Sequence, residues 1–229
     1  MSIVKHWPKV LSLSLLGLLT LAVSGAQANW EIEGKELTAN ESVAAKAHTP
    51  WGLGVPAKNF EIKCNATETE GLKLLAKSAT AEGKIKLTGC ATFEIKSGTE
   101  LKNCKPKEPI ILGIKILMIL HNNEIYLLLE PASGTKFTTL EFSELCAITE
   151  TADLIGTRVD ECGHLTSPGN TWVHLDCGNG QPRFFIRPAP KLLFPSDIKL
   201  FGKSEVEDSG ITELELSGAN KGKTWGGRI

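Results

Sequence analysis

The sequence lacks the short motifs by which many enzymes are identified. It contains no Cys-x-x-Cys pair, no G-x-S-x-G turn for a serine nucleophile, no G-x-G-x-x-G after a strand and no G-x-x-x-x-G-K-[ST] phosphate loop. Glycosidases need two carboxylates at a set separation, and the 26 acidic residues offer no way to choose a pair. We therefore assign no catalytic residue and no cofactor, and a secreted hydrolase remains only an alternative.

The sequence also has little net charge and few aromatic residues. The formal net charge is −1, and aromatic residues make up 6% of the chain. A near-neutral chain lacks the basic surface that nucleic acids and anionic membranes attract, so we predict neither as a partner. The single tyrosine, Tyr126, lies in an apolar run, and we interpret it as structural.

The N-terminal region has the pattern of a signal peptide. Lys5 and Lys9 lead into an apolar run over residues 10–23, and Ala26-Gln27-Ala28 supplies the small residues of a cleavage site. That run is about 14 residues long, whereas a membrane-spanning helix needs roughly 20. We predict a signal peptide over residues 1–28 and one exported domain over residues 29–229, which is secreted, periplasmic or on the cell surface.

No later segment has the length of a transmembrane helix. The most apolar run, residues 110–120, is too short and contains Gly113 and Lys115. Removal of the leader takes away two lysines and no acid, so the mature chain has 23 basic and 26 acidic residues. We expect a mature protein without a membrane span.

Six cysteines follow the leader, and export changes how they are interpreted. An even number of cysteines in an oxidising compartment favours disulfides, for which about 15 connectivities are possible. Proximity along the chain favours Cys90–Cys104 and Cys162–Cys177, which leaves Cys64–Cys146 as the third pair.

Residues 110–145 are the most apolar and most clearly patterned part of the chain. The run over residues 110–120, the Asn122-Asn123 turn and the run over residues 124–130 predict a hairpin of two buried strands. Because the first run is continuous, we expect both of its faces to be covered. A buried helix is the competing interpretation, but five isoleucines and Gly113 favour a strand. Residues 137–142 alternate and predict a third, half-buried strand.

Shorter alternating segments complete the fold prediction. Residues 60–64, 72–77 and 83–88 are expected to form strands, with a turn over residues 79–82. The whole pattern predicts an all-β fold, an antiparallel β-sandwich in one domain. Two packed β subdomains, divided near residues 147–156, are the alternative.

The segment LLLEPASGTKFTTLEFSELCAI (residues 127–148), with the earlier FEIKC and LTGC, resembles uncharacterised exported bacterial proteins with β-rich domains. Such proteins tend to begin near a tryptophan-containing strand, as at Asn29-Trp30. They tend to close with an alternating strand and a tail rich in glycine and lysine, as over residues 211–229. The resemblance spans most of the mature chain and implies an exported β fold. Its motifs are strand and turn residues, so it implies no catalytic residue.

One cluster has the residue types of a metal site: Cys162, His164, His174 and Cys177. Zinc prefers four nitrogen and sulfur ligands, which these side chains would supply. The spacing differs from that of a standard zinc finger, and export favours a Cys162–Cys177 disulfide with two surface histidines. We therefore predict no metal and keep zinc as the alternative.

Four aromatic residues lie in surroundings rich in proline and glycine, where binding platforms for sugars or peptides occur: Trp51, Trp172, Phe184 and Phe185. The competing interpretation is that they anchor loops to the core. We expect a non-catalytic exported β protein with a structural or adhesive role at the cell envelope or in the medium. A secreted glycan- or peptide-binding module is the alternative, with a glycan or an envelope protein as the possible partner.

Overall fold

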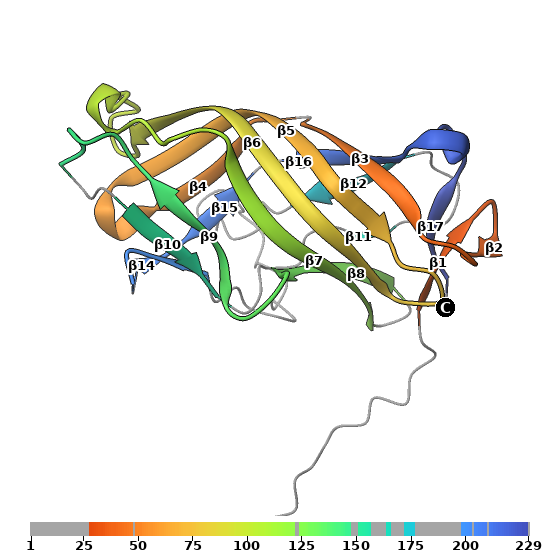
Figure 1. Ribbon diagram of the computed structural model, residues 1–229. Coiled ribbons are helices and arrows are strands. Elements are labelled where there is room, and N and C mark those ends of the chain that lie inside the picture. Colours follow the sequence, from red (N-terminus) through yellow and green to blue (C-terminus); the bar gives the residue numbers. More distant parts are fainter. Residues whose placement is uncertain are drawn as a thin grey trace, which may run out of the picture.

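Figure 1 shows the computed structural model, which describes residues 28–47, 49–121, 124–147, 151–156, 164–165, 172–176, 198–202, 204–209 and 211–228. These residues form antiparallel β-strands and three single-turn 3-10 helices, at Pro56–Lys58, Lys102–Cys104 and Gly218–Asn220. No helix in this part of the chain is long and apolar enough to cross a membrane. The predicted signal peptide lies outside the described residues, apart from Ala28.

The largest sheet has ten strands, and its hydrogen-bonded order is β11-β8-β7-β6-β5-β3-β16-β12. Strand β4 pairs with the first part of β5, beside β3, and β15 pairs with the far edge of β4. The strands of this sheet are β3 Glu41–Ala47, β4 Trp51–Val55, β5 Phe60–Leu74, β6 Thr80–Glu94, β7 Ile110–His121, β8 Glu124–Pro131, β11 His164–Leu165, β12 Trp172–Asp176, β15 Glu207–Ser209 and β16 Ile211–Leu216.

Two smaller sheets complete the molecule. A four-stranded sheet has the order β14-β13-β10-β9, and a three-stranded sheet has the order β17-β1-β2. Their strands are β9 Lys136–Glu141, β10 Thr151–Ile155, β13 Lys199–Leu200, β14 Ser204–Glu205, β1 Asn29–Ile32, β2 Lys35–Glu36 and β17 Trp225–Arg228. The large sheet packs against the smaller ones, so the predicted all-β sandwich is confirmed.

A hairpin of two 15-residue strands, β5 and β6, runs through the middle of the large sheet (Figure 1). The strands predicted at residues 60–64 and 83–88 are parts of this hairpin, whereas the strand predicted at residues 72–77 ends at Leu74, so that prediction was wrong for residues 75–77. The turn lies between Leu74 and Thr80, so the prediction of a turn at residues 79–82 was wrong for residues 80–82. Residues of β-strand type on both sides of a short turn explain the length of the arms.

Both arms of the hairpin contain an irregularity that keeps one face apolar. Buried positions are separated by three residues, not two, from Cys64 to Thr67 in β5 and from Leu87 to Cys90 in β6. Gly89, which has φ +65°, breaks the alternation of β6 at this point. The two interruptions lie opposite each other, so the register of the strands is unchanged on either side.

Strand β7 has one buried face and one partly exposed face. The even-numbered residues from 110 to 118 are buried, whereas the odd-numbered residues from 111 to 117 are partly exposed. The expectation that both faces of this strand are covered was therefore wrong. The sequence does not reveal the difference in burial between the two faces, because most outward positions are also apolar and only Gly113 and Lys115 interrupt the run.

Charged residues of alternating sign cross the outward face of the large sheet. Lys73 of β5 lies opposite Glu82 of β6, which lies opposite Lys115 of β7, which in turn lies opposite Glu130 of β8. Opposite charges in directly paired positions favour this register, and like charges would oppose a shifted one.

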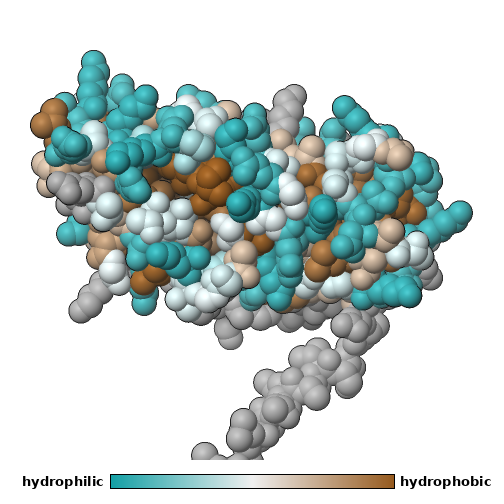
Figure 2. All heavy atoms as spheres, in the orientation of Figure 1, coloured by the Kyte–Doolittle hydropathy of each residue, from teal (hydrophilic) through white to brown (hydrophobic). Residues whose placement is uncertain are grey.

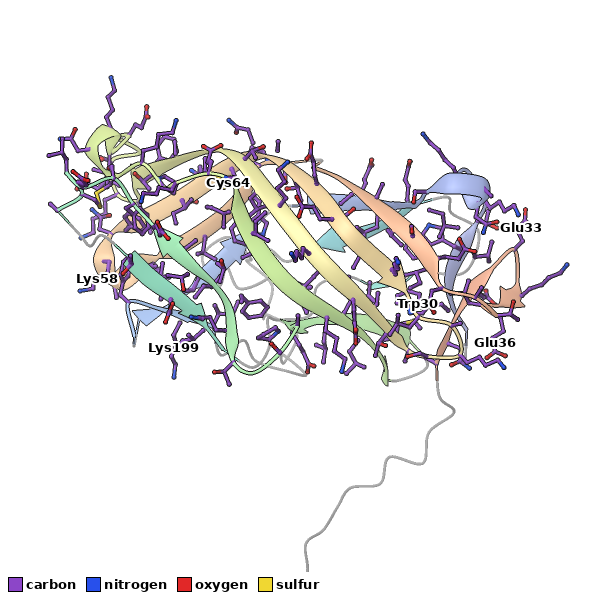
Figure 3. All side chains as sticks on the ribbon, in the orientation of Figure 1. Trp30, Glu33, Glu36, Lys58, Cys64 and Lys199 are labelled. Carbon is purple, nitrogen blue, oxygen red and sulfur yellow. A yellow bond between two sulfur atoms is a disulfide. The ribbon has the colours of Figure 1, made fainter. Side chains whose placement is uncertain are left out.

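The core joins the layers through aromatic contacts. Phe60 of β5 lies edge-on between Phe142 and Phe201, with ring centroids 5.7 Å and 5.6 Å away. Phe142 follows β9 and Phe201 follows β13, so this contact packs the four-stranded sheet onto the large one. Trp30 lies at the far end of the hairpin (Figure 3). Its indole N–H donates to the Thr80 carbonyl at 2.7 Å, and its ring packs on Trp225.

Two disulfides join strands and loops that are distant in sequence. Cys64 bonds to Cys90 across the β5–β6 hairpin, and Cys104 bonds to Cys146. The predicted pairs Cys90–Cys104 and Cys64–Cys146 were therefore wrong, because the register of the hairpin places Cys64 directly opposite Cys90. The predicted Cys162–Cys177 pair lies outside the described residues.

We predict that Gly83→Ala destabilises the protein. A Cβ atom at Gly83 would lie 2.4 Å from the Leu72 Cα, and a backbone atom in the middle of the sheet has little freedom to move. The expected loss is at least about 2 kcal/mol of unfolding free energy, measured by urea denaturation. Gly226→Ala is the control, because no atom lies within 4 Å of its Cβ. Equal stabilities of the two variants would contradict the close approach of β6 to β5.

Candidate functional site

The residues of the predicted zinc cluster are only partly covered by the described chain. Cys162 and Cys177 lie outside it. His164 begins β11 and His174 lies in β12. These are the first and last strands in the hydrogen-bonded order of the large sheet. These two strands contact each other, so the sheet brings the backbones of the two histidines into one region. No group of three potential ligands lies together among the described residues, and the zinc alternative stays untested.

Of the four residues of the predicted aromatic platform, the structure describes only the side chain of Trp51. Trp51 is partly buried in β4 and packs against the core, as expected of a loop anchor. Trp172 begins β12, and its side chain is not described. Phe184 and Phe185 lie outside the described residues. Their role as binding residues remains a prediction.

A groove that the sequence did not indicate lies between β7 and β9. Its volume is about 230 Å³, and residues 107–111 and 138–141 line it. Figure 2 shows apolar atoms at the base of a hollow on this side of the molecule, with hydrophilic side chains around it. Pro109, Ile110, Ile111 and Leu140 are the apolar members of the lining.

At one end of the groove, the loop before β7 and the end of β9 are joined by a short ladder of backbone hydrogen bonds. The Lys107 N–H donates to the Glu141 carbonyl at 2.7 Å, and the Ser143 N–H donates to the Lys105 carbonyl at 3.0 Å. This ladder attaches residues 105–107 to the four-stranded sheet. The groove opens where the ladder stops.

Pro109 ends that ladder because a proline nitrogen carries no hydrogen. From Ile110 onward the same segment pairs with β6 of the large sheet, with Ile110 opposite Leu87. A single stretch of chain therefore leaves one layer and enters the other over residues 108–109. The groove is the wedge that opens between the two layers at this point.

The β7 side of the groove has a free strand edge at Ile111. The Met118 N–H donates to the carbonyl of Ala79, the residue immediately before β6. The backbone groups of even-numbered residues in β7 therefore point toward β6. Those of odd-numbered residues point to the opposite side. The β8 chain covers that side only as far as Gly113, whose carbonyl accepts from the Ala132 N–H. The N–H and C=O of Ile111 are therefore directed to the groove side.

The β9 side has a second free edge, at Thr139. Strand β9 is the last strand of its sheet, with β10 on its other edge. The Glu141 backbone is directed toward residues 105–107, away from β10. Because backbone direction alternates along a strand, the N–H and C=O of Thr139 point the same way, into the groove.

Two ion pairs lie in or beside the groove. The Lys107 ammonium lies 3.0 Å from the Glu141 carboxylate, whose hydrogen bond and charge raise the pKa of Lys107 above its ordinary value. The Thr139 hydroxyl donates to the Asp153 carboxylate and thereby lowers its pKa, and the Lys136 ammonium, 3.5 Å away, acts in the same direction. These groups are exposed, and their charges cancel in pairs.

Glu108 supports the groove from the β6 side. Its two carboxylate oxygens accept hydrogen bonds from the N–H groups of Gly89 and Cys90, each at 2.8 Å. Two successive N–H groups point the same way because Gly89 breaks the alternation of β6. The β7 strand begins only at Ile110, so the Glu108 side chain satisfies donors that a strand partner would otherwise satisfy.

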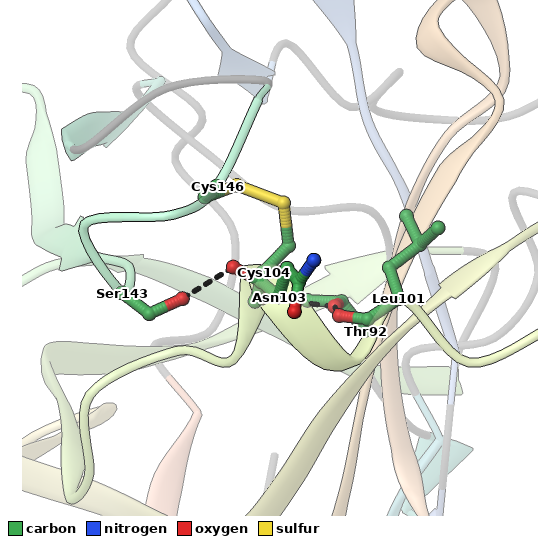
Figure 4. Close-up of a disulfide and its surroundings, with 6 residues drawn as sticks. All are labelled: Thr92, Leu101, Asn103, Cys104, Ser143 and Cys146. Carbon is green, nitrogen blue, oxygen red and sulfur yellow. Dashed lines mark hydrogen bonds between the residues drawn. A yellow bond between two sulfur atoms is a disulfide. The ribbon is translucent and has the colours of Figure 1, made fainter.

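The Cys104–Cys146 disulfide holds the closed end of the wedge (Figure 4). The Ser143 hydroxyl donates to the Asn103 carbonyl, and the Thr92 hydroxyl donates to the Cys104 carbonyl at 2.9 Å. A closed loop of this size stabilises a fold by about 3–4 kcal/mol in the chain-entropy description. The two walls of the groove are thereby fixed relative to each other.

Comparisons of the chain with models of protein families, with curated proteins and with solved structures found no match. The resemblance to exported bacterial β-rich proteins stays a prediction.

We predict that Glu108→Ala destabilises the protein by about 1–2 kcal/mol, because it removes both acceptors from Gly89 and Cys90. Glu108→Gln, which keeps one acceptor oxygen, should lose less. Glu100→Gln, at an exposed position, is the control and should leave the urea midpoint unchanged. A Glu108→Ala protein as stable as the control would show that the carboxylate does not bind these amides.

The pKa of Asp153 should lie below its ordinary value of about 3.9. A carboxyl with a lowered pKa favours the folded state above its unfolded pKa, and this contribution is lost as the pH falls through the lowered value. Thr139→Val removes the hydroxyl donor, so the pKa should rise toward the ordinary value. A carbon-13 NMR titration of the Asp153 carboxyl measures both, and identical curves would contradict the assigned hydrogen bond.

Proposed function

We propose that this chain is an exported, non-catalytic β protein with a structural or adhesive role at the cell envelope or in the medium. The observation that carries the proposal is the pair of disulfides within the core. Cys64 and Cys90 are 0% and 2% exposed, and Cys104 and Cys146 are also buried. Disulfides of this kind are typical of proteins that fold in an oxidising compartment, in agreement with the predicted leader.

The chemistry of the groove supports binding in preference to catalysis. Its lining contains backbone edges, aliphatic side chains, two threonines and charged groups, but no histidine, cysteine or serine. Lys107 and Glu141 neutralise each other at the surface, where water screens them. Among the residues that line this groove, no hydroxyl is paired with a histidine base.

The alternative of a glycan-binding module has less support than that of a peptide-binding module. Sugars stack on exposed aromatic faces, and Trp51 packs against the core. The remaining aromatic candidates, Trp172, Phe184 and Phe185, have no described side chains. The lining of the groove between β7 and β9 contains no aromatic side chain either.

Export can be tested by expressing the full chain in a bacterium and analysing each cell fraction by mass spectrometry. We expect a mature protein that begins at Asn29 in the periplasm or medium, with linked peptides containing Cys64–Cys90 and Cys104–Cys146. The control replaces Leu15 and Leu16 with Arg, which should retain the chain in the cytoplasm with reduced thiols. Cytoplasmic, reduced wild-type protein would refute the proposal.

The adhesive role predicts saturable co-sedimentation of the purified, oxidised chain with washed cell envelopes. The same preparation should show no turnover of a panel of ester and glycoside substrates. Reduction of the disulfides is the matched treatment and should lower binding, because the walls of the groove lose the Cys104–Cys146 brace. A turnover that follows the protein through purification would contradict the non-catalytic role.

A further inference from the structure

We infer that folding hides the processing site of this protein, so that the bond between Ala28 and Asn29 is cleaved before β1 pairs with β17. This inference rests on the proposed export and concerns the order of cleavage and folding. Its basis is the position of the predicted cleavage site, which lies directly at the start of a strand and next to a buried residue.

The residues on both sides of this bond are part of the packed structure. Ala28 is 5% exposed and belongs to the hydrophobic core, and Asn29 is the first residue of β1. Asn29 lies opposite Arg228 in the antiparallel pair that β1 forms with β17, and Figure 1 shows these two strands side by side. Strand β1 is the middle strand of its sheet, because β2 pairs with its other edge. The backbone beside the bond therefore belongs to a hydrogen-bonded ladder.

Trp30 anchors this strand in the core, two residues after Ala28. Its side chain is buried, its indole N–H donates to the Thr80 carbonyl at 2.7 Å, and its ring centroid lies 5.9 Å from that of Trp225. The Trp30 carbonyl accepts a hydrogen bond from the Leu37 N–H at 2.8 Å. Withdrawal of β1 from its sheet breaks these contacts and exposes a large aromatic ring to water.

An enzyme that cleaves a peptide bond needs access to the backbone on both sides of it. In the folded chain, that access requires a local opening that releases β1 from its neighbours. The rate of cleavage then follows the small population of the open state, when opening and closing are fast compared with cleavage. In the unfolded chain the same residues are accessible at once. Folding should therefore slow the removal of the leader.

The partner strand β17 comes almost two hundred residues after β1 in the chain. A chain that emerges with its N-terminal part first presents the cleavage site long before residues 225–228 arrive. The sheet that covers the site cannot be complete during this interval. The topology therefore leaves the site accessible during translocation and covers it afterwards.

The fold also accommodates the new end that cleavage creates. Hydrolysis of the bond by a water molecule leaves a carboxylate on Ala28 and an amino group on Asn29. The Glu33 N–H donates to the Thr224 carbonyl, and the alternation of an antiparallel pair places the Asn29 nitrogen opposite Arg228 in the same way. The amino group of the mature chain therefore remains a donor for β17, and the tryptophan anchor is unchanged.

The experiment uses the full chain, purified in detergent with its leader, and a purified bacterial signal peptidase. The chain is diluted from urea either directly into the enzyme or after it has folded and formed its disulfides. Mass spectrometry follows the appearance of the amino terminus at Asn29. We expect the folded chain to be cut at least about tenfold more slowly than the chain that meets the enzyme unfolded.

Gly226→Pro tests the contribution of β17. Gly226 lies opposite Glu31 of β1, and a proline at this position has no N–H for the ladder. The folded variant should be cut at least about tenfold faster than the folded wild type. Gly226→Ala is the matched control and should be cut at the wild-type rate, because no atom lies within 4 Å of its Cβ. The comparison of folded and unfolded wild type needs no variant, so it tests the inference even where the proline variant does not fold.

The outcomes separate the inference from the proposed export. Equal cleavage of the folded and the unfolded wild-type chain, or of the two folded Gly226 variants, would overturn the inference and leave the export proposal intact. A wild-type chain that the enzyme does not cut even when it is unfolded would reject the predicted leader, and with it both the export proposal and the inference.

Discussion

The structure depends on one segment that hydrogen-bonds to both layers of the sandwich. Residues 105–107 pair with the end of β9, and from Ile110 the same segment pairs with β6. Backbone groups must find partners when they leave water, so a strand that changes sheets does so at a residue that needs fewer partners. Pro109, which has no N–H, meets this condition. The separation of the layers and the groove between them follow from this change.

The irregular features near this segment depend on one another. Gly89 adopts φ +65°, so that two successive N–H groups of β6 point away from β5. The β7 strand has not yet begun there, and the Glu108 carboxylate satisfies both groups. The same irregularity keeps Leu87 and Cys90 on the buried face, and Cys90 can then bond to Cys64. The bulge, the carboxylate and the disulfide therefore form one unit of structure.

The sequence predicted most of the strands but not the features that lie between them. Alternation in residues 60–64 and 83–88 identified parts of β5 and β6, because period two reports a half-buried strand. It did not show that both belong to 15-residue arms, since the alternation of buried and exposed positions is interrupted in each arm. The prediction that cysteines pair with their nearest neighbours in sequence failed because it ignored strand register. In this hairpin, Cys64 and Cys90 lie at equal distances from the turn, and register matters more than separation in sequence.

The groove was not predictable from the sequence by periodicity. Residues 105–109 contain two prolines and two lysines, which resemble ordinary loop composition. The structural effect of Pro109 depends on its neighbour β9, a strand that begins almost thirty residues later in the chain. The direction of the Thr139 and Ile111 backbone groups likewise follows from register with other strands. These are tertiary properties, and a single sequence contains no local signal for them.

The free strand edges beside this groove could pair with other chains and cause aggregation. Exposed strand edges pair readily with other chains, and proteins limit this with short edges and charged neighbours. Each edge here is short, and the pairs Lys107–Glu141 and Lys136–Asp153 flank the β9 edge. A long flat strand would have to displace these charges, so the short edges flanked by charges oppose pairing with further chains. The Cys104–Cys146 bond links the segment before β7 to the segment after β9, and together with the backbone bonds between residues 105–107 and 141–143 it holds both edges within the fold.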